Sequence, residues 1–307
     1  MLSRLAAAVS VLAMSSRTAS AWWQPKPGTS YQIQLNGELD LSYDVDMYDI
    51  DLFDTPNDTI AELQARGVKV VCYFSAGTYE DWRSDAGLYT DDMIGEALPE
   101  WKGEYWIDTT SEALRAILVT RMELAQAKGC DGVDPDNVDG AFNDSGFNLT
   151  NATQLDFNRF LAEQAHALNL TVGLKNDLDQ IEQLVTEFDF AVNEQCVEND
   201  ECDVLVPFVE HDKPVFGIEY DGDKAKGCAT ANALDFDTLY MDMNLDGSRY
   251  SCREEDGSSS ESVASGSTDS SSSGDSSSTG SNLSSERPLM STLSLLLVAS
   301  VAVAVAL

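Results

Sequence analysis

The sequence predicts an α/β fold, a (β/α)8 barrel of the TIM type, on three observations. Short apolar or β-branched runs alternate with longer amphipathic segments through residues 22–253, and such alternation predicts a parallel sheet with right-handed crossovers. Eight or nine runs of this kind favour closure into a barrel over a doubly wound sheet. No G-x-G-x-x-G motif follows the first run, which weakens the dinucleotide-binding alternative.

The expected elements follow these runs in chain order. We expect strands at Tyr31–Leu35, Val45–Leu52, Val68–Phe74, Tyr105–Asp108, Gly132–Asp134, Leu170–Lys175, Phe188–Asn193, Pro214–Tyr220 and Thr238–Met243. A (β/α)8 barrel has eight strands, so one of the nine expected strands is extra. It belongs to a hairpin, is added at the rim of the barrel, or is wrongly predicted. We expect helices at Asp58–Arg66, Ser111–Lys128, Gln154–Leu168 and Asp177–Glu187. Ser111 is a suitable N-cap for the second of these.

Both ends of the chain have the composition of targeting segments. Residues 1–21 are expected to be a signal peptide, with Arg4, an apolar stretch at Leu5–Met14 and a small-x-small site at Ala19–Ala21. Residues 254–282 are rich in serine and predict a disordered, O-glycosylated stalk. Residues 283–307 end in an apolar run with no basic flank, which favours a GPI-anchor signal over a C-terminal transmembrane segment. The folded domain is therefore expected at residues 22–253 of a secreted, surface-attached protein.

The charge balance limits the class of partner. The net charge of −35 comes from 53 acidic and 18 basic side chains. Such a surface excludes nucleic acid and anionic lipid as natural partners, and it favours cationic ligands, metal ions or solubility in an acidic medium. The run Asp242–Gly247 begins like a calcium loop, but Arg253 stands where a bidentate glutamate belongs. We therefore predict no metal and no cofactor.

Six cysteines in a chain with a signal peptide indicate disulfides. We expect Cys196 to pair with Cys202 in one loop and Cys228 with Cys252 around the last strand. Cys72 and Cys130 lie in strand-like runs and either pair or remain buried thiols. Five N-x-[ST] sequons, at Asn57, Asn143, Asn148, Asn151 and Asn169, fit an extracellular glycoprotein.

Polar and acidic residues are concentrated where the expected strands end. In a barrel these ends meet on one face, where function is located. The residues concerned are Asp49, Asp51, Tyr73, Asp134, Asp136, Asn137, Lys175, Glu194, Glu219 and Tyr220. Buried carboxylates without partners are costly, so a ring of them predicts an open cleft. Two carboxylates that face one cleft are the minimum for glycoside hydrolysis.

Other hydrolytic chemistries have weaker support. The chain contains only two histidines, His166 and His211, and no G-x-S-x-G motif. A Ser–His–Asp triad or a histidine-ligated zinc site is therefore poorly supported.

Six segments in a fixed order carry a family resemblance. They are Trp23–Leu35, Tyr48–Asp54, Cys72–Gly77, Gly129–Asp139, Gly173–Asp177 and Phe190–Cys196. Together they resemble glycoside hydrolase family 114, which contains endo-α-1,4-polygalactosaminidases. The resemblance covers nearly all of the expected domain, and any one segment alone would be a weak signal.

The resemblance implies a barrel that cleaves α-1,4 linkages in galactosamine polymers with an acidic pair. That pair would be Asp136 and Glu194, since both positions carry the expected residue type. We expect Asp136 to be the nucleophile and Glu194 the general acid/base, with the opposite assignment open. The linkage specificity and the pair rest on the resemblance.

The acidic composition suits such a substrate, because de-N-acetylated galactosamine is a cation. We expect carboxylates from four strand ends to pair with its ammonium groups: Asp49, Asp51, Asp134 and Glu219. Tyr73 and Tyr220 could stack on sugar rings, Lys175 could orient Asp136 or contact a hydroxyl, and Asn137 could contact the substrate. We expect a monomer that binds a cationic polysaccharide and touches the membrane only through its C-terminal segment.

Two alternatives stay open at this stage. One is a non-catalytic cell-wall glycan-binding or structural surface protein that keeps the barrel for binding. The other is a glycosidase of the same fold that acts on a different sugar, because specificity resides in the loops.

Overall fold

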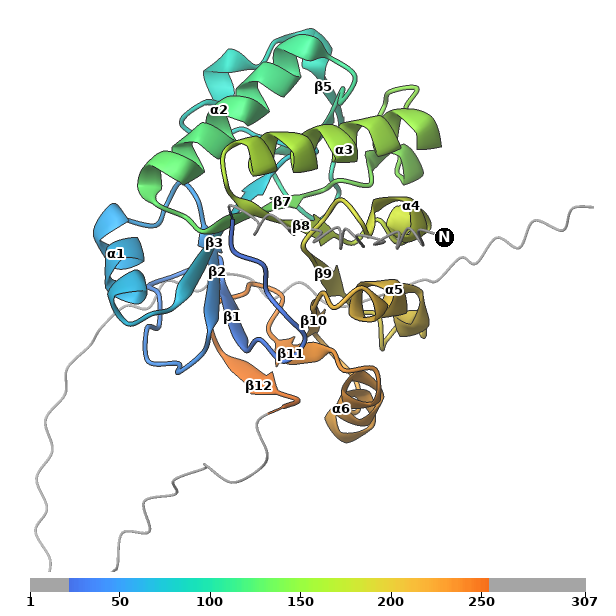
Figure 1. The fold of residues 1–307 in the computed structure, drawn as a ribbon. Helices are drawn as coiled ribbons and strands as arrows, with labels where there is room; N and C mark the ends of the chain where they lie inside the picture. The colour runs from blue at the N-terminus through green and yellow to red at the C-terminus, as the bar shows by residue number, and fades with distance from the viewer. Residues whose placement is uncertain (1–21, 254–307) are drawn as a thin grey trace, which may run out of the picture. The chain divides into compact units, whose positions relative to one another are not determined.

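The computed structural model describes residues 22–253, so the predicted signal peptide (1–21), stalk (254–282) and anchor segment (283–307) lie outside the described residues. Nine strands form one curled sheet in the order β1-β2-β3-β7-β8-β9-β10-β11-β12. The first eight are parallel, and β12 pairs antiparallel with β11. The helices lie around the outside of this sheet (Figure 1). The predicted barrel of the TIM type is confirmed.

The strands of the curled sheet are short and buried. They are β1 (Tyr31–Gln34), β2 (Met47–Asp51), β3 (Lys69–Ser75), β7 (Gly132–Asp136), β8 (Thr171–Lys175), β9 (Phe190–Glu194), β10 (Val215–Glu219), β11 (Asp237–Met241) and β12 (Arg249–Ser251). Eight of the nine predicted strands overlap the eight parallel ones. β12 was not expected as a strand.

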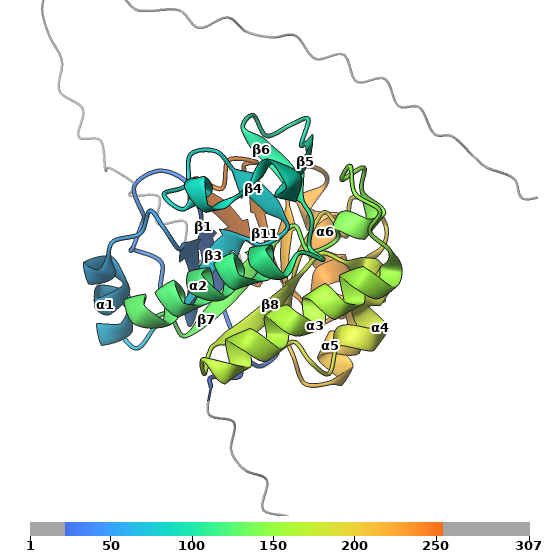
Figure 2. The ribbon, with the colours of Figure 1, turned by 90° about the horizontal axis from the view of Figure 1, so that it is seen from above.

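The remaining predicted strand, Tyr105–Asp108, belongs to a different sheet. It corresponds to β6 (Glu104–Ile107), which pairs antiparallel with β4 (Thr78–Glu80) and β5 (Ile94–Ala97). We call this three-stranded unit the wall sheet. It lies on the connection between β3 and α2 and stands beside the mouth of the barrel (Figure 2). β6 ends in the continuous apolar run Tyr105–Ile107, which resembles a buried barrel strand, and the sequence therefore did not separate the two.

The helices match the predictions where the helical pattern of apolar residues extends over a long segment. They are α1 (Asn57–Ala65), α2 (Glu112–Lys128), α3 (Asn151–Ala167), α4 (Ile181–Leu184), α5 (Val206–Glu210) and α6 (Lys224–Ala233). The Ser111 side chain accepts the Leu114 N–H at the start of α2, as expected for an N-cap. The predicted helix Asp177–Glu187 is wrong as one continuous helix, because the range holds a three-residue 3-10 turn (Leu178–Gln180) followed by the four-residue α4.

Two apolar cores hold the barrel together. Alternate strand residues such as Tyr31, Val71 and Phe216 fill the barrel interior, and the other face packs against the helices. The sheet is bridged between its two ends, because the Leu35 N–H donates to the Leu245 carbonyl (3.0 Å). The curvature therefore gathers the carboxyl ends of all the parallel strands around one opening.

Three disulfides fasten this frame: Cys72–Cys130, Cys196–Cys202 and Cys228–Cys252. The two expected pairs are confirmed, and the pair left open is a bond between β3 and the segment before β7. None of the helices in residues 22–253 is long and apolar enough to cross a membrane.

Candidate active site

The carboxyl ends of the strands surround a cavity of about 550 Å³. Each of the eight parallel strands, or the turn that follows it, contributes lining side chains: Asn36, Asp51, Tyr73, Asp136, Lys175, Glu194, Tyr220 and Met243 are one from each. The wall sheet and its turns form one side with Glu80, Trp82, Trp101, Glu104 and Trp106. Side chains from all eight parallel strands, or from the turns that follow them, therefore meet in this cavity.

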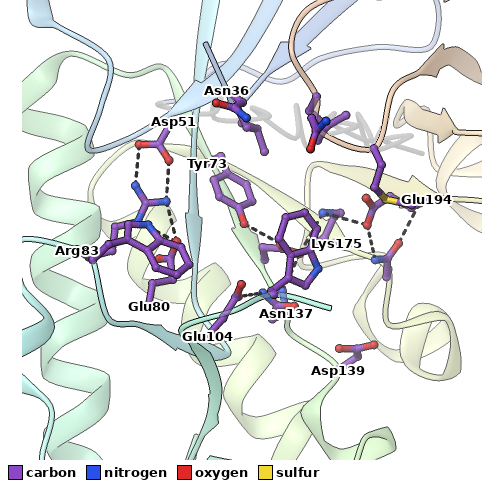
Figure 3. Close-up of a pocket in the computed structure, with 18 of the residues that line it drawn as sticks. Asn36, Asp51, Tyr73, Glu80, Arg83, Glu104, Asn137, Asp139, Lys175 and Glu194 are labelled. Carbon is purple, nitrogen blue, oxygen red and sulfur yellow. Dashed lines mark hydrogen bonds and ion pairs between the residues drawn. The ribbon is translucent and has the colours of Figure 1, made fainter. Parts of the chain in front are cut away.

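Two carboxylates and one ammonium form the centre of this cavity (Figure 3). Lys175 Nζ lies 3.0 Å from Asp136 Oδ1 and 3.3 Å from Glu194 Oε2. The Lys175 side chain is only 4% exposed, and Asp136 and Glu194 keep 17% and 25%. A reacting group in the cavity can therefore reach both carboxylates while the ammonium stays below them.

The backbone at these strand ends adopts an uncommon conformation that aims the side chains. The residues directly after β7, β8 and β9 are Asn137, Asn176 and Gln195, and their φ angles are 60°, 52° and 64°. Left-handed backbone at non-glycine residues costs free energy and is concentrated at functional sites. Gly77 fits the same junction, because a Cβ there would lie 1.6 Å from the Asn137 carbonyl oxygen.

Asp136 is held as a carboxylate. Burial would raise its pKa, but the Lys175 charge, together with hydrogen bonds, lowers the pKa below the usual aspartate value. Tyr73 Oη donates to Asp136 Oδ2 (2.8 Å), and the Asn137 N–H donates to Oδ1 (2.8 Å). Burial and the Asp136 charge also raise the pKa of Tyr73 well above its usual value, so that its hydroxyl remains a donor. This carboxylate is ionised and oriented.

Glu194 has a different set of partners. Tyr220 Oη donates to Glu194 Oε1, and Asn176 Nδ2 donates to Oε2 (3.1 Å). The Asn176 amide oxygen also accepts the Glu194 N–H (3.0 Å), so one side chain fixes both the backbone and the carboxylate of this residue. Burial, followed by the Glu194 charge, raises the pKa of Tyr220. Both tyrosines therefore donate hydrogen bonds to the carboxylates.

A third acid from the wall sheet joins the same network. Asn137 Nδ2 donates to Ser75 Oγ (3.0 Å) and to Glu104 Oε1 (3.2 Å), and Thr78 Oγ1 also donates to Glu104. Burial, with a further contribution from the Asp136 charge, raises the pKa of Glu104 to about 7. Glu104 is thus protonated in acidic solution and titrates near neutral pH.

Asp51 lies in the cavity but already has a cationic partner. Its Oδ2 lies 2.7 Å from Arg83 Nη2, and the same guanidinium contacts Glu80 at 2.8 Å (Figure 3). The Asp51 carboxylate also accepts the Phe53 and Asp54 N–H groups. Asp51 therefore shapes the cavity more than it offers a free charge to a ligand.

Asp49 and Asp134 lie below the cavity. Both side chains point into the barrel interior, with exposures of 1% and 0%. Burial raises the pKa of Asp49 well above the usual value, and the charge of Asp134 raises it further; burial also raises the pKa of Asp134 to about 7. Burial therefore disfavours the ionised form of both groups. Neither residue lines the cavity.

Glu219 points away from the cavity. Phe216 and Ile218 face the barrel interior, so the strand alternation turns Glu219 to the outer face. Its carboxylate accepts the Val197 and Glu198 N–H groups at 2.8 and 3.3 Å and thereby holds the turn after β9. The Glu219 carboxylate therefore binds the backbone, and its position does not support the predicted contact with a ligand in the cavity.

Comparison with known proteins identifies the family. The family model of glycoside hydrolases GH114 matches residues 13–256. The chain belongs to glycoside hydrolase family 114. It is therefore a glycosidase, and the family expected from the six sequence segments is confirmed.

Two solved structures place this family 114 barrel among its relatives. The crystal structure of Aspergillus fumigatus Ega3 in complex with galactosamine is 43% identical, with a TM-score of 0.73, and the match covers 77% of this chain and all of that one. The glycoside hydrolase domain of PelA from Pseudomonas aeruginosa is 14% identical, with a TM-score of 0.58. This match covers 72% of this chain and 98% of the PelA domain. The second likeness concerns the fold alone. A search of curated proteins finds no match.

The family 114 site contains residues that the sequence did not single out. Asn176 was part of a resemblance segment but had no expected role, and its left-handed backbone is the signal that it sits at a junction. Glu104, Arg83 and Trp106 come from the wall sheet and its turns, which the sequence did not resolve. Among the predicted residues, the cavity brings together Asp51, Tyr73, Asp136, Asn137, Lys175, Glu194 and Tyr220.

Proposed function

We propose that this protein is an endo-acting hydrolase of α-1,4-linked, galactosamine-containing polysaccharide, with Asp136 as nucleophile and Glu194 as general acid/base. The observation that carries the proposal is the bridge from Lys175 Nζ to both carboxylates, at 3.0 and 3.3 Å. The galactosamine bound to the 43% identical relative supports the choice of sugar.

The lowered pKa of Asp136 supports its role as nucleophile. A carboxylate that attacks an anomeric carbon must be ionised, and Lys175, Tyr73 and the Asn137 N–H favour that form. Glu194 would protonate the leaving glycosidic oxygen and then, as a carboxylate, remove a proton from the incoming water. Its partners Tyr220 and Asn176 hold it on the opposite side of Lys175.

The spacing favours retention of anomeric configuration. Because one ammonium contacts both groups, the two contacting oxygens are separated by no more than the sum of two hydrogen-bond lengths. Retaining glycosidases have carboxyl groups about 5–5.5 Å apart, whereas inverting enzymes need about 6.5–9.5 Å to admit a water molecule. A covalent glycosyl ester on Asp136 is the intermediate of such a retaining mechanism.

The acidic cavity suits a cationic polymer. Asp139 and Glu104 line it together with the catalytic pair, and Asp54 reaches its edge. These carboxylates raise the local concentration of ammonium groups. Binding without cleavage, as in a wall-bound lectin, would not need an ionised Asp136 beside a second carboxylate.

Hydrolysis of partially de-N-acetylated galactosaminan tests the proposal. Wild-type protein should release short oligomers, and Asp136→Asn should lower kcat by at least about 10³-fold, as expected when a nucleophile is lost. Glu194→Gln should lower kcat most with substrates that have poor leaving groups. Asp203→Asn, an exposed aspartate outside the cavity, is the matched control. Binding of the polymer by the wild type without any cleavage would support the lectin alternative and refute the proposal.

We also propose that the protein acts outside the cell, attached to its surface by a GPI anchor. The sequence of residues 1–21 and 283–307 supports this location, and so do three disulfides. Release of the protein from intact cells by a phosphatidylinositol-specific phospholipase tests the anchor, and retention after that treatment would favour a transmembrane tail.

A further inference from the structure

Two tryptophans remain exposed at the edge of the catalytic cavity. Trp82 is 52% exposed and Trp101 is 49% exposed, and both line the cavity. Large aromatic side chains are usually covered, so an exposed pair in a cavity is a candidate binding surface. Neither residue has a role in the mechanism described above.

The wall sheet brings the two side chains to the same place. β4 and β6 pair antiparallel with Glu80 opposite Glu104, and the Asp81 N–H continues the ladder to the Gly103 carbonyl (3.0 Å). Trp82 follows Asp81, and Trp101 lies in the turn just before Gly103. Both tryptophans therefore lie at the outer end of the wall sheet.

Gly103 allows this turn to be tight. Its φ is +96°, and a Cβ at this position would lie 2.8 Å from Asp81 Oδ1. The turn that carries Trp101 is closed by the Glu104 N–H, which donates to the Trp101 carbonyl (3.2 Å). The position of Trp101 is thus set by backbone bonds of the wall sheet rather than by burial of its ring.

The path from the catalytic centre to the tryptophans follows the wall sheet. Asn137, next to Asp136, contacts Glu104 at 3.2 Å, and Glu104 lies three residues from Trp101. The surface continues past this point, because a second cavity of about 490 Å³ shares Asp54, Trp82 and Arg83 with the catalytic cavity. A ligand that extends from the catalytic centre on this side would therefore pass Trp101, which lines the first cavity, and Trp82, which lines both.

We propose that Trp82 and Trp101 form a distal binding platform for sugar rings of a cationic galactosamine polymer, outside the catalytic centre. This inference rests on the proposed function and specifies where the rest of the polymer binds. The C–H face of a pyranose packs on an indole ring, and an ammonium group is attracted to the same ring face. Asp54 and Asp81 add negative charge beside the platform.

A platform of this kind serves an enzyme that cuts within chains. Contacts with remote rings hold the polymer in register while the catalytic pair acts on one linkage. Their contribution is present in the ground state and the transition state alike, so their loss should raise KM more than it lowers kcat.

Cleavage of de-N-acetylated galactosamine oligomers of increasing length, and of the polymer, tests the platform. Trp82→Ala and Trp101→Ala should each raise KM for the polymer roughly tenfold. The effect should shrink as the oligomer shortens, because a short oligomer no longer reaches the platform. Trp101→Tyr, which keeps an aromatic face, should recover most of the affinity.

Leu88→Ala is the matched control, since Leu88 lies on the same connection, is 56% exposed and does not line the cavity. Wild-type KM on the polymer in both tryptophan variants would overturn the inference, and so would an equal loss at every chain length. Calorimetric binding of the polymer to Asp136→Asn, with and without the tryptophan changes, measures the platform without catalysis. Absence of cleavage by the wild type together with tryptophan-dependent binding would refute the proposed function and leave the platform standing.

Discussion

Asp177 provides a sharp test of how burial controls stability in this barrel. The residue follows β8 and is 3% exposed. Its Oδ2 accepts a hydrogen bond from Asn158 Nδ2 on α3 (2.6 Å), and its Oδ1 has no partner among the described residues. Burial, followed by the negative charge of Asp139, raises its pKa from 3.8 to about 8. The folded protein therefore keeps a proton on Asp177 that the unfolded chain releases.

The protein should become less stable as the pH rises, because the pKa of Asp177 is higher in the folded protein than in the unfolded chain. Between pH 4 and pH 8 unfolding releases one proton from Asp177, so the free energy of unfolding falls by about 1.4 kcal/mol for each unit of rising pH. The stabilisation is fully present below pH 4 and is lost as the pH approaches 8. Between pH 5 and pH 7 the loss from this one group is about 2.7 kcal/mol. That is a large share of the about 5–15 kcal/mol by which domains are stable.

Urea denaturation of wild type and Asp177→Asn at pH 5 and pH 7 measures this contribution. The amide cannot ionise, so the variant should lose about 2.7 kcal/mol less than wild type between the two pH values. Other buried acids, such as Glu104, titrate equally in both proteins and cancel in the comparison. Asp203→Asn, the same change at an exposed position, should follow the wild type. Equal losses in wild type and Asp177→Asn would refute the reasoning.

The remaining predictions concern charge, buried partners and cross-links. Lys175→Met should lower kcat by at least about 10²-fold. It should also shift the fall of kcat/KM at acidic pH to higher pH, because the pKa of Asp136 would rise without the ammonium group. A pH–rate profile whose acidic side is unchanged would contradict this. Asp49→Asn replaces a buried carboxyl group by a neutral amide of the same shape and should leave the free energy of unfolding nearly unchanged, whereas Asp49→Leu, which removes the polar group, should cost about 1–3 kcal/mol in urea denaturation. Cys72→Ala removes the Cys72–Cys130 disulfide and so opens a loop of 58 residues. The free energy of unfolding should fall by about 4 kcal/mol in the same assay, because the unfolded chain gains conformational entropy. A change below about 1 kcal/mol would contradict this explanation.

The barrel, and the meeting of Asp136 and Glu194 in one cavity, were accessible from the sequence for physical reasons. Parallel strands buried on both faces give continuous apolar runs, and their carboxyl ends are gathered on one side by the topology. Asp136 and Glu194 end two such runs and lie in the same cavity. The family resemblance added their expected roles.

Side-chain direction was the information that the sequence did not supply directly. Glu219 was grouped with the cleft because it stands at a strand end, yet it follows Ile218, which faces the barrel interior, so it turns outward. Asp134 does face inward, but it lies one layer deeper than Asp136 and is fully buried. Among carboxylates that point into the barrel, only one that lies close to the carboxyl end of its strand can contact a ligand in the cavity.

The wall sheet was inaccessible for another reason. Its strands β4 and β5 are three and four residues long, too short for a periodic signal. Trp82 and Trp101 lie in the turns around these strands, and the pairing of β4 with β6 is what gathers them. Their exposure becomes visible only in three dimensions.

The single ammonium between two carboxylates has a consequence for the whole reaction cycle. With the proposed roles, an ionised Asp136 attacks while Glu194 gives a proton to the leaving oxygen, and Lys175 contacts both side chains. In the glycosyl-enzyme Asp136 becomes a neutral ester while Glu194 has lost its proton, so the negative charge has passed from one side of Lys175 to the other. The net charge of these three groups is unchanged by this step, so the cationic polymer meets the same net charge at the centre of the cavity before and after each bond is cut.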